Sequence, residues 1–280
     1  MILTKMTNDI PRRKDGGIKW NFRPVNQEEL EACLKDPLWR VCSGVLYKII
    51  IKGDDGQDGL VINFKPNRSQ RRLLANLWHR NVILKARQLG FTTLICILWL
   101  DTALFSENVR CGIIAQDREA AEVIFRDKVK FAYENLPENL KSAMPLARDS
   151  ASELLFAHNN SSIRVATSMR SGTIHRLHIS EFGKICAKYP EKAKEVVTGS
   201  IPAVPKNGIL IIESTAEGRE GEFYDITMRA KSAKESGKDL TVRDYRFHFF
   251  AWWDANEYEM PADSVKLTDK DNAYFERIES

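Results

Sequence analysis

The sequence predicts a three-layer α/β domain with a mainly parallel central sheet. From about residue 68 to residue 250, short apolar segments with the character of strands alternate with segments that have helical spacing. Strands separated by helices favour parallel pairing, because each helix carries the chain back to the end of the sheet where the next strand begins. With 280 residues, of which 43% are hydrophobic, the chain has enough apolar material for the core of such a domain.

The alternation begins with a helix over residues 68–80, where apolar side chains recur on one face. A short apolar run at 81–84 predicts a strand, and a loop then leads into a strongly apolar helix that begins at Thr92. Further strands are predicted at 110–115, 153–156, 162–167, 176–179, 208–212 and 242–250, with a helix near 118–135 and a hairpin turn at 158–161.

Two segments flank the predicted domain. Residues 1–60 are expected to form an N-terminal arm and a small lid, in which the polar and basic start at 1–24 is a loose arm. Residues 251–280 carry many charges and are expected to form a linker. The main domain then covers 61–250. The elements expected in the lid are a helix at 27–35, a strand at 45–52 and a turn at 53–56.

Composition excludes several classes of protein. The five cysteines are odd in number, widely spaced and without a C-x-x-C pair, which argues against a disulfide framework or a zinc site. The longest apolar run, 94–100, is too short to span a bilayer, and charges interrupt the start of the chain where a signal peptide would lie. The net charge of +4 permits a nucleic-acid partner without requiring one. We therefore expect a soluble protein of a reducing compartment, with no membrane partner.

Residues 85–93, Lys-Ala-Arg-Gln-Leu-Gly-Phe-Thr-Thr, lie between the first predicted strand and the apolar helix. They match the phosphate-loop pattern G-x-x-x-x-G-K-[ST] only in part. Gly90 fits the second glycine and Thr92 fits the hydroxyl position. Phe91 stands where the lysine belongs, and Lys85 stands where the first glycine belongs. The pattern by itself therefore fails.

The chemistry of a phosphate site is less strict than the pattern. Backbone N–H groups at a helix start bind phosphate, and Gly90 lets the backbone approach closely. Thr92 can bind magnesium, and Lys85 can fold back over the loop as the cation, with Arg87 as a second candidate. An ordinary strand-to-helix turn is the alternative. The nucleotide-binding residues expected here are Lys85, Ala86, Arg87, Gln88, Leu89, Gly90, Phe91, Thr92 and Thr93.

A buried strand at 176–179 leads into Ser180 and Glu181. In ATPases of large machines, such a strand carries an acid for magnesium and a glutamate that polarises the attacking water. Glu181 is placed for the second role. Ser180 stands where an aspartate is usual, so it can hold a magnesium-bound water without adding charge. We expect Thr92, Ser180 and Glu181 to form the magnesium site, although a strand-end glutamate is also explained as a cap.

A third strand, over 209–212, is followed by small hydroxyl residues at Ser214 and Thr215. Hydroxyl groups at the carboxyl end of a strand can sense the γ-phosphate of a nucleotide. Because ligands of open parallel sheets bind outside the carboxyl ends of the strands, Lys85, Glu181 and Ser214 are expected to converge on one crevice. The three strand ends are jointly more specific than any one motif.

With these motifs, the chain resembles the large terminase subunit of tailed bacteriophages between about residues 66 and 253. Residues 85–93 look like the variant Walker A loop of that family, with its lysine at the front, and 178–182 looks like its Walker B motif with the aspartate replaced. Residues 213–218 are similar to its coupling motif. Gln70 looks like the glutamine that reads adenine. The resemblance implies a RecA-like P-loop NTPase of the ASCE type that uses ATP and magnesium (Mg²⁺).

The resemblance also implies partners and a setting. The family pumps double-stranded DNA into a procapsid as a ring, expected to be a pentamer, on the portal protein and together with the small terminase subunit. This assembly takes place in the host cell cytoplasm. The family also carries a C-terminal nuclease domain of RNase H type. Because this chain stops at Ser280, we expect a fragment or a short form without nuclease activity.

Three arginines are candidates for a catalytic role. Arg118, Arg148 and Arg170 are candidates for an arginine finger that reaches a neighbouring subunit, although each one alone is also explained as a surface residue. The expected catalytic residues are Glu181, Arg87 and Arg148.

Two other functions stay open: a nucleotide- or DNA-binding scaffold that has lost hydrolysis, and a superfamily-2 helicase-like ATPase. A missing second RecA-like domain argues against the helicase.

Overall fold

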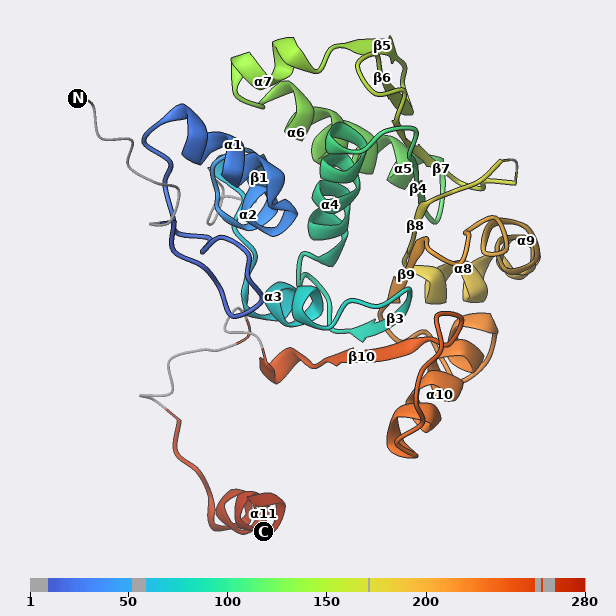
Figure 1. The fold of residues 1–280 in the computed structure, drawn as a ribbon. Coiled ribbons are helices and arrows are strands. Elements are labelled where there is room, and N and C mark those ends of the chain that lie inside the picture. Colours follow the sequence, from blue (N-terminus) through green and yellow to red (C-terminus); the bar gives the residue numbers. More distant parts are fainter. Residues whose placement is uncertain (1–9, 52–58, 171, 255–257, 259–264, 280) are drawn as a thin grey trace.

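The computed structural model describes residues 10–51, 59–170, 172–254, 258 and 265–279. Its centre is an eight-stranded sheet in the order β10-β3-β9-β8-β4-β7-β6-β5 (Figure 1). The strands from β10 to β7 pair in parallel, and β6 and β5 add an antiparallel edge. The strands are β3 (Arg80–Lys85), β4 (Arg110–Ile114), β5 (Leu146–Asp149), β6 (Glu153–Phe156), β7 (Ser162–Ala166), β8 (Arg176–Ser180), β9 (Ile209–Ser214) and β10 (Arg246–Phe250).

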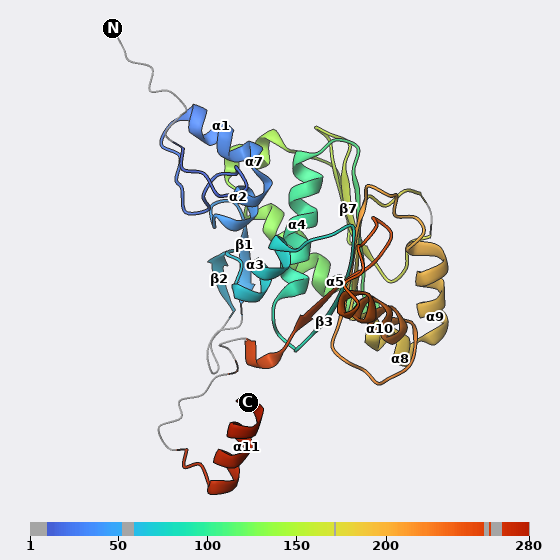
Figure 2. The same cartoon turned by 60° about the horizontal axis from the view of Figure 1, so that its bottom comes forward.

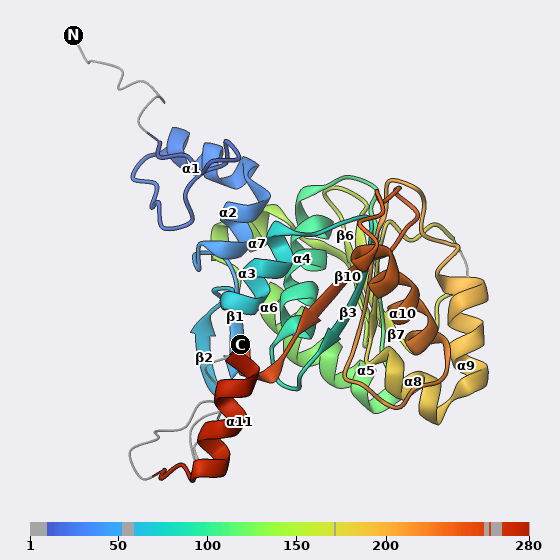
Figure 3. The same cartoon turned by 90° about the horizontal axis from the view of Figure 1, so that it is seen from below.

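Helices cover both faces of this sheet (Figure 3). Successive residues of a strand point to opposite faces, so Ile83 and Ile211 join the core under one layer while Val82 and Ile212 join the core under the other. The first layer contains α4 (Phe91–Phe105), α5 (Arg118–Ile124), the π-helix η2 (Phe125–Lys130) and α6 (Phe131–Glu134). The second layer contains α8 (Phe182–Lys188), α9 (Pro190–Glu195), the π-helix η3 (Val196–Ser200) and α10 (Glu222–Glu235). The predicted three-layer α/β fold with a mainly parallel sheet is confirmed.

The N-terminal part is packed onto the domain rather than loose. Ile10 and Ile18 are buried against Cys33 and Trp39, so the expectation of a loose arm at 1–24 is wrong for residues 10–24. The reason is that these two isoleucines bury apolar surface together with Phe22, while Asp36 accepts hydrogen bonds from the Ile18 N–H and from Arg13. Residues 1–9 and the turn expected at 53–56 lie outside the described residues. The elements here are α1 (Gln27–Lys35), α2 (Pro37–Cys42), β1 (Lys48–Ile51) and β2 (Leu60–Asn63).

A buried ion pair joins this N-terminal part to α4. The Arg40 guanidinium donates to both carboxylate oxygens of Asp101, at 2.8 and 2.7 Å, and the Tyr47 hydroxyl donates to the same carboxylate at 2.7 Å. Arg40 and Asp101 are almost fully buried. Figure 2 shows α2 beside α4, the helix that follows the loop at residues 86–90. The N-terminal part therefore supports the helix on which the candidate site is built.

Several elements differ from the prediction. The helix expected over 68–80 ends early, as α3 (Arg68–Ala75), and α7 (Glu138–Ala143) was not predicted. The hairpin of β1 and β2 extends beyond the expected boundary at residue 60. The segment expected to be a linker contains the 3₁₀ helix η4 (Trp252–Asp254) and α11 (Asp269–Glu279), which stands apart from the sheet in Figure 1. All five cysteines are free thiols. Within the described residues, no helix is long and apolar enough to span a membrane.

Candidate active site

The loop after β3 has the backbone of a phosphate site. Gln88 and Gly90 have φ angles of 56° and 70°, in the left-handed region that glycine tolerates best. A Cβ atom at Gly90 would lie 2.8 Å from Nε2 of Gln70, so the Gln70 side chain would have to shift to admit another residue. The helix α4 then begins at Phe91, and no side chain in the described part of the chain caps its first turn. Its first N–H groups therefore remain available to an anion.

Lys85 lies at the end of β3 and turns inward. Its side chain is 6% exposed, and its Nζ lies 2.9 Å from Oε1 of Glu181 and 3.1 Å from Oε2 of Glu213. Burial alone would lower the pKa of Lys85, but the charges of Glu213 and Glu181 outweigh it and raise the pKa. Lys85 is therefore a buried, charged ammonium group that faces two carboxylates. The predicted convergence of Lys85 and Glu181 is present in the structure.

The other loop residues have separate roles. Phe91, at the position of the usual lysine, is buried with its ring 4.5 Å from the ring of Phe250, so it is a core residue. Leu89 is also buried, while Arg87 and Gln88 are exposed. Ala86 extends the β3–β10 pairing through its N–H, and the Thr93 hydroxyl accepts a hydrogen bond from Nζ of Lys128 at 3.0 Å. Lys85 is thus the cation that points inward, and the buried side chains of Leu89 and Phe91 hold the loop backbone in place.

Glu213 is the residue of this site that the sequence analysis missed. It lies on β9, between β3 and β8, and is fully buried. Its Oε1 accepts hydrogen bonds from the hydroxyls of Thr92 at 3.0 Å and Ser180 at 2.9 Å, and Nε2 of His178 lies 3.3 Å away. Burial alone would raise the pKa of Glu213, but the hydrogen bond to His178 and the charge of Lys85 lower it to about 2.

A signal for this role exists in the sequence. Glu213 directly follows the apolar run Ile-Leu-Ile-Ile, at a position that the strand pattern marks as buried. A carboxylate is rarely buried unless it is paired or hydrogen-bonded, so its presence there indicates a partner.

Glu181 combines partial exposure with a strained backbone. Its φ angle is 52°, which costs energy for a residue with a side chain and is a common feature of functional sites. The side chain is 23% exposed, and Oε2 has no hydrogen-bond partner among the described residues, although Nζ of Lys184 lies 3.7 Å away. Glu181 is therefore the more accessible of the two carboxylates that contact Lys85.

Ser214 does not join this cluster. Adjacent residues on a strand face opposite sides of the sheet, and Glu213 already faces α4 through Thr92. The hydroxyl of Ser214 is buried on the other side, where a Cβ atom at Gly183 in α8 would lie 2.8 Å from it. Thr215 makes a 3.4 Å contact to Glu217 instead. The expectation that Ser214 meets Lys85 and Glu181 is corrected, because the alternation of β9 sends Glu213 there.

Gln70 connects α3 to the loop. Its side-chain oxygen accepts from the N–H of Asn67 at 2.9 Å, and its Nε2 donates to the carbonyl of Gly90 at 2.7 Å. These bonds fix the N-terminus of α3 against the loop. A role of Gln70 in reading adenine stays a prediction.

The three candidate finger arginines lie on the surface. Arg118 is 91% exposed and pairs with Glu122, and Arg170 pairs with Glu195. Arg148 is 65% exposed on β5, which lies six strand positions from β3. At about 4.8 Å per strand this places Arg148 roughly 29 Å from the loop. Arg148 therefore cannot reach the loop of its own chain.

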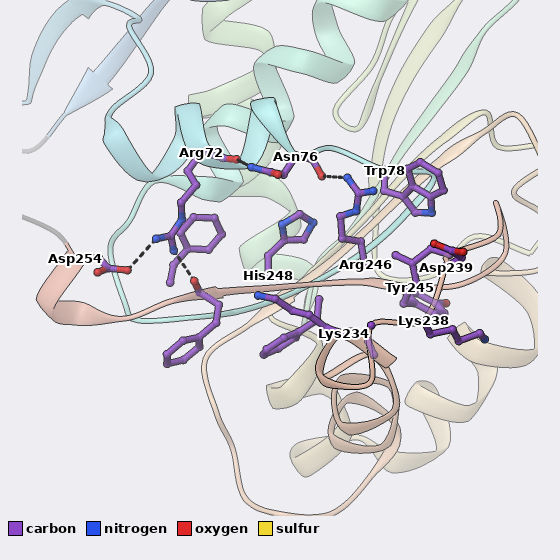
Figure 4. Close-up of a pocket in the computed structure, with 16 residues that line it drawn as sticks. Arg72, Asn76, Trp78, Lys234, Lys238, Asp239, Tyr245, Arg246, His248 and Asp254 are labelled. Atoms are coloured by element: carbon purple, nitrogen blue, oxygen red, sulfur yellow. Dashed lines mark hydrogen bonds and ion pairs between the residues drawn. The ribbon is translucent and has the colours of Figure 1, made fainter. Parts of the chain in front are cut away.

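A hollow lies elsewhere, along the edge strand β10 between α3 and α10, with a volume of about 880 Å³ (Figure 4). Arg72 donates to the carbonyl of Phe249 and pairs with Asp254, and Arg246 donates to the carbonyl of Asn76. The two arginines thus attach the edge strand to α3. None of the loop residues or acidic strand ends described above lines this hollow.

The donor set around Thr92 suits magnesium. In the described part of the chain, no group of three or more His, Cys, Asp or Glu side chains could hold a metal ion by itself. Magnesium in nucleotide sites uses one or two protein groups together with phosphate oxygens and waters. A hydroxyl beside a carboxylate meets that need, and the Thr92 hydroxyl lies 3.0 Å from Oε1 of Glu213. The residues present therefore fit the ion.

Comparison with known proteins adds the fold family. No family model and no curated protein matches the chain. Among solved structures, the chain is similar to the large terminase ATPase domain of Thermus phage P74-26, with a TM-score of 0.52 and 20% identity over 68% of this chain and 83% of that one. It is also similar to the large terminase of bacteriophage HK97, with a TM-score of 0.55 and 16% identity over 82% of this chain and 46% of that one.

These similarities show a shared fold. The chain has the fold of the ATPase domain of phage large terminases, so the resemblance stated from the motifs is confirmed at that level. It spans 46% of the length of the HK97 protein, so less than half of that terminase has a counterpart here. A DEAD box protein of Methanococcus jannaschii is less similar, with a TM-score of 0.39 and 15% identity over 67% of this chain and 48% of that one.

Proposed function

We propose that this chain is the ATPase motor domain of a phage large terminase, which hydrolyses ATP to move double-stranded DNA into a procapsid. The observation that carries the proposal is the cluster of Lys85, Glu181 and Glu213 beside the N-terminus of α4. A cation, a partly exposed carboxylate and a helix N-terminus are the groups that transfer of a phosphoryl group to water requires. The terminase fold supports the choice among nucleotide hydrolases.

Binding of ATP would rearrange the contacts of Lys85. The phosphates would accept hydrogen bonds from the loop backbone and from the first turn of α4, with Thr92 and Thr93 at its start. A phosphate that competes for Lys85 would displace Glu181 first, because Glu181 is 23% exposed whereas Glu213 has no access to solvent. Lys85 would then bridge Glu213 and the phosphate.

Glu181 would be the catalytic base once Lys85 has moved to the phosphate. Its carboxylate would accept a hydrogen bond from the attacking water and orient that water toward the γ-phosphorus. The hydroxyls of Thr92 and Ser180, which both donate to Oε1 of Glu213, would lie on the same side of the sheet as the phosphates. Magnesium, when bound with the nucleotide, would supply neutralisation of the phosphate charge. Arg87, which is exposed at the loop, is a second cation available to the phosphates.

Coupling to movement would pass through β9. The Ser214 hydroxyl lies against Gly183 in the first turn of α8, the helix that begins directly after Glu181. A shift of Glu181 on nucleotide binding would move the first turn of α8. Because Gly183 packs against Ser214, that movement would displace Ser214 and the exposed loop after Thr215. This gives the predicted coupling residues a role on the opposite face of the sheet from the phosphates.

The partners follow from the terminase proposal. They are double-stranded DNA, the portal protein, the small terminase subunit and further copies of this chain in a ring on the portal, all in the host cell cytoplasm. Arg148 would act only on the site of a neighbouring subunit, because the sheet separates it from its own loop. A nucleotide-binding scaffold without hydrolysis is the second candidate. It is favoured by Phe91, which is a core residue, and by Ser180, which carries no charge.

The test is ATP hydrolysis by the purified chain, measured with and without double-stranded DNA. We expect Glu181→Gln to bind ATP as the wild type does but to hydrolyse it about 100- to 10,000-fold more slowly, since a general base contributes that much. The matched control is Lys184→Gln, which removes the other charge beside Glu181 and should leave the rate within about threefold because exposed pairs contribute little.

Two outcomes would reject the proposal. If the wild type binds ATP but does not hydrolyse it even with DNA and a portal ring, the scaffold is the better description. If Glu181→Gln hydrolyses ATP at the wild-type rate, the base has been assigned to the wrong residue.

A further inference from the structure

The acid that normally accompanies a phosphate-loop hydroxyl is missing from its usual strand. In P-loop NTPases, magnesium is held by the loop Ser or Thr together with an aspartate at the end of another strand. Here that strand end, on β8, carries Ser180. A hydroxyl alone gives magnesium no negative charge. The neighbouring strand β9 carries a carboxylate at the same level, because Ser180 and Glu213 are direct partners in the β8–β9 register.

The carboxylate of Glu213 occupies the place next to Thr92 where the missing acid would lie. Oε1 of Glu213 is 3.0 Å from the Thr92 hydroxyl and 2.9 Å from the Ser180 hydroxyl. Register partners on adjacent parallel strands point to the same face of the sheet. A glutamate is one methylene longer than an aspartate, and this extra length lets a residue on β9 reach the space in front of β8.

We infer that Glu213 is the magnesium-side acid of this nucleotide site, transposed by one strand from β8 to β9. This inference rests on the proposed function, since it needs a nucleotide at the loop. Glu181 is then left free to act on water, and Ser180 becomes a donor that orients Glu213. A negative charge is thereby retained beside the loop hydroxyl although the strand-end aspartate is absent.

The way Glu213 is held separates this role from a purely structural one. A partner for Lys85 alone would need one oxygen and no further support. Instead, Oε1 is held by donors from α4 and β8, and His178 approaches the same oxygen. The second oxygen, Oε2, is fully buried and pairs with the Lys85 ammonium at 3.1 Å. Three groups thus fix the carboxylate at Oε1, in addition to the Lys85 ammonium at Oε2.

The experiment measures how strongly magnesium tightens nucleotide binding. A fluorescent ADP is titrated into the purified chain in EDTA and in Mg²⁺, and the ratio of the two dissociation constants is the readout. We expect Glu213→Gln to reduce this ratio about 10- to 100-fold, which is the range for groups that hold or support a metal, while binding in EDTA stays within about threefold of the wild type. Lys184→Gln, which removes a partly exposed charge 3.7 Å from Glu181, should keep the wild-type ratio.

Two further variants keep the test decisive if Glu213→Gln folds poorly. Glu213→Asp keeps the charge opposite Lys85 but withdraws the carboxylate by one methylene, and it should lower the ratio while the melting temperature stays near that of the wild type. Ser180→Asp combined with Glu213→Gln returns the acid to β8 and should restore the ratio. Quenching of the free Mn²⁺ EPR signal in the presence of ADP gives an independent measure of metal binding for each variant.

The outcomes are distinguishable. If Glu213→Gln and Glu213→Asp both keep the wild-type ratio, or if they weaken binding equally in EDTA and in Mg²⁺, the transposed acid is wrong while the nucleotide site stands. If the wild type binds no nucleotide under either condition, the proposed function fails and the inference falls with it.

Discussion

Replacing Lys85 by methionine should destabilise the protein strongly. The change removes the cation that lies 2.9 Å from Glu181 and 3.1 Å from Glu213, and it leaves the fully buried Glu213 carboxylate without its counter-charge. Glu181 can turn toward solvent, so the cost comes mainly from Glu213. Removing one partner of a buried ion pair costs about 3–5 kcal/mol. For a domain of this size that corresponds to a fall in melting temperature of roughly 10 °C.

Circular dichroism melting curves measure this cost, and a second change locates it. Adding Glu213→Gln to Lys85→Met removes the unpaired charge while an amide oxygen still faces Thr92, so most of the lost melting temperature should return. Lys184→Met is the control, since its Nζ lies 3.7 Å from Glu181 at a partly exposed position, and it should shift stability by less than about 1 kcal/mol. A fall of under about 2 °C for Lys85→Met, or a double variant that is less stable than the single one, would refute this reasoning.

Three further predictions concern stability and the loop. Gly90→Ala places a Cβ at φ +70° and should cost about 1–2 kcal/mol and weaken nucleotide binding, whereas Gly199→Ala, whose Cβ would meet only an ordinary contact at 3.8 Å, should not weaken binding. Asp101→Ala leaves the buried Arg40 unpaired and should lower stability by about 3 kcal/mol or more in denaturant titrations; a loss below about 1 kcal/mol contradicts this. Burial and nearby cations lower the pKa of His248 to about 4, so the unfolded chain binds more protons between pH 6.5 and 4 and stability falls as the pH falls through that window; His248→Gln should flatten this dependence.

Much of the fold follows from patterns that the sequence displays locally. The buried parallel strands are continuous apolar runs, and the helices between them have apolar residues at helical spacing, so their order could be predicted. The edge strand β5 (Leu146–Asp149) could not, because Leu-Ala-Arg-Asp has neither an apolar run nor an alternating pattern. The packing of residues 10–24 was missed for a related reason, since the segment is anchored by isolated residues, such as Ile18, Phe22 and Arg13, that form no periodic pattern.

The candidate site was predictable for those residues whose position follows from the end of one predicted strand. Lys85 and Glu181 each follow a buried strand, and the structure brings them together as an ion pair. Glu213 was missed because its partners, Thr92 and Ser180, come from other elements, and the register that aligns them is set by the assembled sheet. The orientation of Ser214 was wrong for the same reason. The alternation of a strand fixes which residues share a face, but only the partners show which face meets the nucleotide loop.

The most direct test of the account is a structure of the chain with magnesium and a non-hydrolysable ATP analogue. The account predicts that Nζ of Lys85 lies within hydrogen-bond distance of a phosphate oxygen, that Glu181 has separated from Lys85, and that Glu213 stays beside Thr92. A phosphate bound by Arg87 while Lys85 remains paired with Glu181, or a nucleotide bound away from the N-terminus of α4, would contradict it.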